Sequence, residues 1–114
     1  MRIVRGRLYV VDFNPRVRTK PGKVRPAIVI QDDIFNDAGY PSTLVVPTTT
    51  KLVDTDTPLR LRLLRGTAGL DRDSDVLVAQ VIAVANESFR KELGELPADV
   101  ARALDRQLRL VMGL

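Results

Sequence analysis

The chain has no cysteine and no histidine. Without cysteine, disulfides, thiolate metal sites and cysteine nucleophiles are excluded, which fits a reducing compartment. The absence of histidine removes the commonest general acid or base and the commonest metal ligand. Any chemistry must therefore use Arg, Lys, Asp, Glu, Tyr, Ser or Thr.

Long apolar runs are also lacking. No window approaches the roughly 20 apolar residues of a membrane span, and the N-terminus MRIVRGRLYVVDF is too charged for a signal peptide. We therefore expect a cytoplasmic protein without membrane contact. The 114 residues suit one domain, residues 1–114, with one core.

Positive charge is in excess. The formal net charge is +4, and arginine outnumbers lysine 14 to 4. Arginine presents paired donors that suit phosphate, so a polyanionic partner is one interpretation. An Arg-rich proteome would give the same composition.

Short apolar or alternating segments bounded by turn residues predict a mainly β (α+β) chain. We expect strands over residues 7–13, 26–31, 43–47 and 59–63, and over residues 75–84 as one strand or as two joined by a bend. Pro26 lacks a ladder donor and should be the first residue of its strand. Arg60 and Arg62 alternate with leucines and are most simply a solvated strand face.

The last segment changes to a helical period. Val100, Leu104, Leu108 and Val111 share one face between Pro97 and Gly113. A shorter helix is expected within residues 86–92, and residues 32–42 are expected to be turn-rich. Together these elements predict a curled antiparallel sheet closed by a C-terminal helix.

Arg25 precedes one predicted strand, and Thr48, Thr49 and Thr50 follow the next. If the two strands are neighbours, a guanidinium and hydroxyl donors meet at one sheet edge, which suits a phosphate. Ordinary surface charge and turn or cap threonines are the alternatives.

Several separated motifs resemble one known family. They are Arg5-Gly6, the run YVVDFNP at 9–15, VRPAIVIQDD at 24–33 with Asn36, PSTLVVPTTT at 41–50, GLDRDS at 69–74 leading to Gln80, LGEL at 93–96 and the final MGL. In this order and spacing the chain resembles the MazF/PemK toxin endoribonucleases of type II toxin–antitoxin systems.

The resemblance implies a small, strongly curved antiparallel barrel of SH3-like or plasmid-toxin type. It implies a homodimer that cuts single-stranded RNA, mRNA in particular, at short sequences without metal or cofactor. The products would carry 2′,3′-cyclic phosphate and 5′-hydroxyl ends, and cutting would inhibit translation and growth. A cognate antitoxin would block the activity, and the toxin would reach operator DNA indirectly through that antitoxin.

The resemblance also implies site residues. The family's catalytic arginine corresponds to Arg25 and its catalytic threonine to Thr49, with Thr48 and Thr50 one residue away. Candidate substrate contacts come from the basic first loop, the strand ends and the segment before Gln80, and no metal ligands are expected. These candidates are Arg5, Arg16, Arg18, Lys20, Lys23, Gln31, Asp32, Thr48, Thr50 and Gln80.

The chain departs from the family at two acidic positions. Many relatives carry Gly-x-Glu roughly where this chain has Arg18-Thr19-Lys20, and often an acid where it has Ala79. The first change puts a base role for that glutamate in doubt. Two non-cleaving alternatives stay open: a related barrel that acts on DNA gyrase, and a nucleic-acid-binding module that has lost cleavage.

Overall fold

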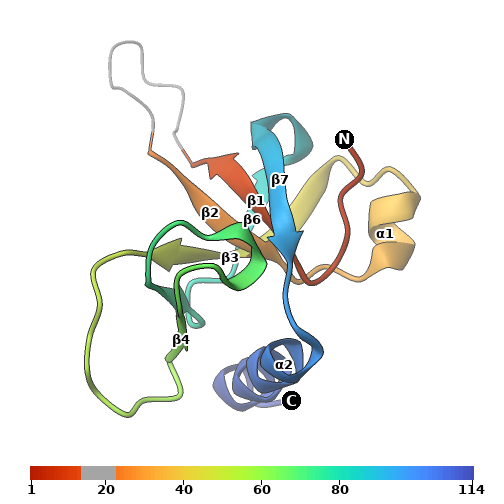
Figure 1. Ribbon diagram of the computed structural model, residues 1–114. Helices are drawn as coiled ribbons and strands as arrows, with labels where there is room; N and C mark the ends of the chain where they lie inside the picture. Colours follow the sequence, from red (N-terminus) through yellow and green to blue (C-terminus); the bar gives the residue numbers. More distant parts are fainter. Residues whose placement is uncertain (14–22) are drawn as a thin grey trace.

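The computed structural model describes residues 1–13 and 23–114. Seven strands form one antiparallel sheet in the order β4-β5-β3-β2-β1-β7, with β6 also paired to β3 (Figure 1). The strands are β1 (Arg7–Asp12), β2 (Val24–Val29), β3 (Ser42–Thr49), β4 (Arg60–Leu63), β5 (Ser74–Leu77), β6 (Ile82–Ala85) and β7 (Phe89–Glu95).

This architecture confirms the predicted fold class, a curved antiparallel sheet with a C-terminal helix. Within the described ranges, β4 and β7 stand at the two ends of the strand order and are not paired to each other. The sheet is therefore not closed into a complete barrel.

Strand β3 is the longest and has two partners along one edge. Its first half pairs with β6, with Thr43 opposite Val84, and its last residues pair with β5, with Thr49 opposite Asp75. The predicted segment 75–84 is thus two strands joined by a bend. That bend lies beside the middle of β3, close to Pro47.

Both faces of the central strands are buried, which explains why these strands read as nearly continuous apolar runs. One face contributes Leu8, Ile28 and Val46 to a cluster that the C-terminal helix covers. The other face contributes Tyr9, Val29 and Val45, and the ring of Tyr9 meets that of Phe89 edge-on at 5.3 Å.

The C-terminal helix α2 spans Ala98–Met112 and lies across the end of the sheet (Figure 1). Leu104 and Leu108 are buried, and Val100 and Val111 pack beside them, so the predicted apolar face is confirmed. Gly113 ends the helix with a left-handed φ of 70°, a conformation that glycine adopts without strain.

Three local predictions were wrong. Pro26 is the third residue of β2, not its first. Residues 86–92, expected to hold a short helix, divide between the 3-10 turn η2 (Asn86–Ser88) and β7, where pairing with β1 overrides helix propensity. The turn-rich segment contains the five-residue helix α1 (Asp33–Asp37).

A second 3-10 turn, η1 (Thr67–Gly69), lies in the connection from β4 to β5.

Candidate functional site

Arg25 and Thr49 lie on the neighbouring strands β2 and β3. In the β2–β3 pairing Ala27 lies opposite Pro47, and Arg25 and Thr49 each lie two residues beyond this paired segment. A hydrogen bond from the Thr48 hydroxyl to the Pro26 carbonyl, 2.8 Å, joins the two strands in between. The two side chains therefore come from the same end of this strand pair.

The three threonines differ in how their hydroxyls are used. Thr48 is 2% exposed, and its hydroxyl donates to the carbonyl of Pro26, so its hydrogen is already used within the protein. The hydroxyl of Thr49 is half-buried and accepts a bond from the Lys51 N–H at 3.2 Å, so its own hydrogen stays available to a ligand. Thr50 is exposed.

These residues surround a hollow of about 310 Å³, which we call the threonine hollow. Its lining includes the start of β2, the end of β3 and the segment between η1 and β5: Val24, Arg25, Pro26, Thr48, Thr49, Thr50, Lys51, Leu70, Asp71 and Ser74. Cationic groups and hydroxyl donors therefore face one space of the size that small ligands occupy.

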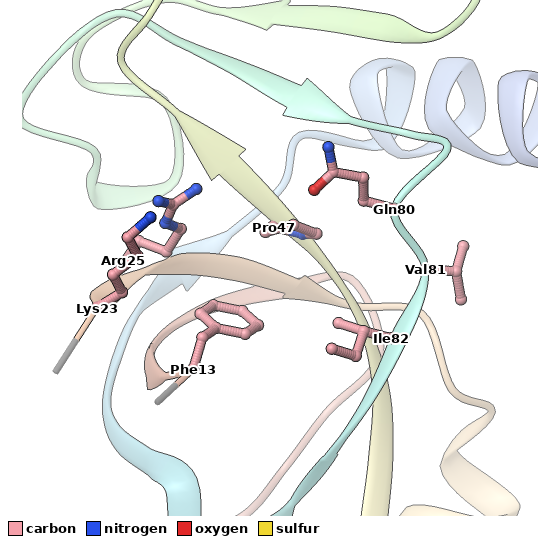
Figure 2. A pocket seen from close by; sticks show the side chains of 7 residues that line it. All are labelled: Phe13, Lys23, Arg25, Pro47, Gln80, Val81 and Ile82. Atoms are coloured by element: carbon pink, nitrogen blue, oxygen red, sulfur yellow. The ribbon is translucent and has the colours of Figure 1, made fainter. Parts of the chain in front are cut away.

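A second hollow, of about 410 Å³, adjoins the first at Arg25, and we call it the glutamine hollow. Figure 2 shows its lining residues Phe13, Lys23, Arg25, Pro47, Gln80, Val81 and Ile82. Gln80 comes from the bend between β5 and β6, and its amide extends over Pro47 (Figure 2). Phe13 supplies an aromatic ring that the sequence analysis did not single out.

Charge in these hollows is mainly positive. Arg25 is half-buried and forms no ion pair within residues 1–13 and 23–114. Lys23 and Lys51 add two cations, and of the described residues only Asp71 adds a carboxylate. An anionic ligand therefore meets a guanidinium that no described carboxylate neutralises.

A buried carboxylate fixes the segment beyond Thr50. Asp75 is 1% exposed and accepts bonds from Arg62 Nε at 2.6 Å, Arg60 Nη1 at 3.1 Å and the Val53 N–H at 3.1 Å. Burial opposes ionisation of Asp75, yet these donors outweigh it, so the pKa of the carboxyl is lowered.

The strand face predicted to be solvated at Arg60 and Arg62 is exposed at Arg62 and half-buried at Arg60, and both side chains also have a structural role. Both guanidinium groups turn onto Asp75 and also donate to the carbonyls of Lys51 and Val53, at 2.9 and 3.2 Å. The two arginines fix the position of the segment directly after the threonines. The sequence does not reveal this role, because their partner Asp75 lies in a separate apolar run.

A close backbone approach positions the segment that carries Asp71. A Cβ on Gly69, whose φ is 79°, would lie 2.3 Å from the Leu93 carbonyl oxygen, and one on Gly94 would lie 2.8 Å from Ala68 backbone atoms. Only glycine fits at both positions. The turn η1 is thereby pressed against β7, immediately before Leu70 and Asp71.

Other predicted substrate contacts lie away from Arg25. Gln31 and Asp32 follow the opposite end of β2, where the Gln31 amide bonds to Asn36, Ser42 and Leu44 and the Asp32 carboxylate caps α1. Arg5 bridges the Ile30 carbonyl and Asp105 on α2. Arg16, Arg18 and Lys20 lie outside the described residues, whereas Lys23 and Gln80 line the glutamine hollow.

Comparison with known proteins shows the family of this chain. A family model described as the PemK-like, MazF-like toxin of type II toxin–antitoxin systems matches residues 4–112. The chain belongs to this toxin family. It is 31% identical over all 114 residues, and over the full length of each relative, to "Endoribonuclease MazF2" of Mycobacterium bovis and "Endoribonuclease MazF6" of Mycobacterium tuberculosis.

Solved structures of PemK/MazF toxins have the same fold. A MazE–MazF complex (Form-II) from Deinococcus radiodurans aligns with a TM-score of 0.81 at 23% identity, covering 100% of this chain and 98% of that one. A mycobacterial endoribonuclease in complex with its cognate antitoxin aligns at 0.77 and 16% identity, covering 99% and 95%. The family and the fold expected from the sequence motifs are therefore confirmed.

The described residues of this PemK/MazF toxin offer neither a cluster of metal ligands nor a membrane-spanning helix. Across the described ranges, no group of three or more His, Cys, Asp or Glu residues could hold a metal ion. None of the helices in those ranges is long and apolar enough to cross a membrane.

Proposed function

We propose that this chain, as a single toxin domain, is an endoribonuclease that cuts single-stranded RNA, mRNA in particular, at short sequences without metal. The observation that carries this proposal is the threonine hollow, which an arginine without a described carboxylate partner and a threonine line together. The names of the mycobacterial relatives support the same activity.

The arrangement suits attack by RNA on itself. The ribose 2′-hydroxyl attacks the adjacent phosphorus, the P–O5′ bond breaks, and the products are a 2′,3′-cyclic phosphate and a 5′-hydroxyl. Arg25 stabilises the charge that grows on the phosphoryl oxygens and can protonate the leaving O5′. Thr49 donates a hydrogen bond to the same phosphate. Losing one such donor costs on the order of 10²- to 10³-fold in rate.

The glutamine hollow is suited to a base next to that phosphate. Its apolar wall with Phe13 offers a stacking surface, and the exposed amide of Gln80 can donate to and accept from a base edge. Phosphate contacts position the strand and base contacts specify it. We therefore assign positioning to Arg25 and sequence choice to the side around Gln80.

We further propose a cytoplasmic homodimer that a cognate antitoxin inhibits and that reaches operator DNA through that antitoxin. The solved relatives in complex with their antitoxins support the inhibitor. Large apolar side chains are exposed on α1, β3 and β6, which supports contact with a protein partner; they are Ile34, Phe35, Leu44 and Ile82. Inhibition of translation and growth follows from cutting mRNA.

The test is incubation of the purified chain with long RNA in EDTA, followed by sequencing of the ends. Discrete cuts that leave 5′-hydroxyl ends, and no cutting of RNA with a 2′-deoxy nucleotide at the site, are expected. Arg25→Ala and Thr49→Val should each reduce cutting by about 10² to 10³-fold. Arg106→Ala, which removes an exposed arginine on α2, is the matched control and should cut normally.

Intact RNA at high protein concentration would refute the endonuclease. The two alternatives then separate by one further measurement. Inhibition of purified DNA gyrase would identify a gyrase poison, and retained RNA or DNA binding without either effect would identify a binding module that has lost cleavage.

A further inference from the structure

The proposed reaction leaves one proton without an acceptor. Attack by the 2′-hydroxyl releases a proton, and arginine and lysine are already protonated at neutral pH. The chain has no histidine to take that proton. A carboxylate is therefore the natural group to look for beside the scissile linkage.

We propose that Asp71 is the general base of this site, which rests on the proposed function above. Asp71 lines the threonine hollow together with Arg25 and Thr49, and no other described carboxylate does. The segment 14–22, NPRVRTKPG, contains no acidic residue, so it offers no competing carboxylate wherever it lies.

Two neighbouring carboxylates are already engaged. Asp12, opposite Val24 in the sheet, pairs with Arg90 at 2.9 Å, and Asp75 lies opposite Thr49. Its oxygens are already bonded to Arg60, Arg62 and the Val53 N–H, and it is 1% exposed. Those donors stabilise its charged form, which makes it a weak proton acceptor. Asp75 thus has a structural role, and Asp71 is the carboxylate that remains to act as the base.

Asp71 is placed and exposed as a base requires. It is solvent-exposed, and within the part of the chain that the structure describes its carboxylate has no hydrogen bond or ion pair. The close packing of Gly69 and Gly94 fixes the backbone just before it. Because Asp71 and Arg25 line one hollow without pairing, space remains between them for a phosphate.

One proton is taken up and one is released in this step. The Asp71 carboxylate takes the proton as the O2′–H bond breaks and the O2′–P bond forms. The P–O5′ bond breaks, and the leaving O5′ takes a proton from Arg25. Asp71 ends neutral and Arg25 deprotonated, and exchange with water restores both.

The test compares Asp71→Asn with Asp73→Asn in the full chain, using single-turnover cleavage of an RNA that wild type cuts. Asp73 lies two residues away and accepts a bond from the Arg65 N–H, which asparagine can also accept. Asp71→Asn should lower the cleavage rate by about 10² to 10⁴-fold, and Asp73→Asn should leave it unchanged. Asp71→Glu, which keeps a carboxylate, should recover part of the loss.

The pH dependence separates a base from a structural or specificity role. Without a base, hydroxide must take the proton, so the Asp71→Asn rate should rise about tenfold per pH unit and approach wild type at alkaline pH. A deficit that stays constant with pH, a changed cleavage sequence at an undiminished rate, or wild-type cutting would each overturn the proposal. Failure of wild type to cut RNA in EDTA would instead overturn the proposed function itself.

Discussion

Replacing Asp75 by alanine should destabilise the protein at neutral pH and far less in acid. The substitution removes a buried acceptor of three hydrogen bonds, two of them from guanidinium groups. Breaking such a buried pair costs about 3–5 kcal/mol. The Arg60 and Arg62 side chains are 27% and 35% exposed and can regain water, so we expect the low end, about 3 kcal/mol.

The pH dependence follows from the lowered pKa of Asp75 relative to its ordinary value of 3.8. The unfolded chain binds the proton more readily, so this stabilisation is present above pH 3.8 and is lost as pH falls through the folded pKa. Urea unfolding at fixed protein concentration, followed from neutral to acid pH, measures the difference between wild type and variant.

A matched control is Asp54→Ala, since Asp54 also bonds to Arg62 but its side chain is 92% exposed. That change should cost less than about 0.5 kcal/mol. Equal effects of the two substitutions, or a wild-type-to-variant difference that persists unchanged in acid, would refute the reasoning.

Three other substitutions test the site and its supports. Thr48→Val should lower the free energy of unfolding by about 1–3 kcal/mol, measured in urea, because the partly buried Pro26 carbonyl loses its donor; Thr49→Val should leave that free energy within about 0.5 kcal/mol of wild type. Gly69→Ala should destabilise by more than about 2 kcal/mol by thermal or urea unfolding, since its Cβ would meet Leu93 backbone, and a neutral result would mean that η1 can move away. Gln80→Ala should change the RNA sequence that is cut, which sequencing of the cleavage ends measures. The cleavage rate at the sequences that the variant prefers should fall little.

The sequence predicted those parts of the fold that depend on local pattern. The face of α2 and the central strands were correct because burial on one or two faces leaves a direct trace in residue periodicity. The strand β7 was missed because Phe89 and its neighbours pair with β1, far away in sequence, and residues such as Glu92 carry no local preference for a strand. The helix α1 has only five residues, too few to show a period.

The candidate site likewise has residues that the sequence predicted and residues that it could not predict. Arg25 and Thr49 were predicted from their positions beside two expected neighbouring strands, and in the structure both residues line the threonine hollow. The bonds of Gln31 to α1 and β3, and of Arg60 and Arg62 to Asp75, could not be predicted, since each depends on tertiary contacts between separate segments. The same holds for Phe13 and Asp71, which enter the hollows only after folding.

Arg25 belongs to two spaces at once, and this has a consequence for control. A ligand that binds in the glutamine hollow beside Phe13 and Gln80 and pairs with the Arg25 guanidinium takes that cation away from the threonine hollow, even if the ligand never reaches Thr49. An inhibitor thus needs to occupy only the glutamine hollow to block the activity of both. Competition with substrate then arises from the shared charge of Arg25, and the inhibitor need not have the shape of the RNA.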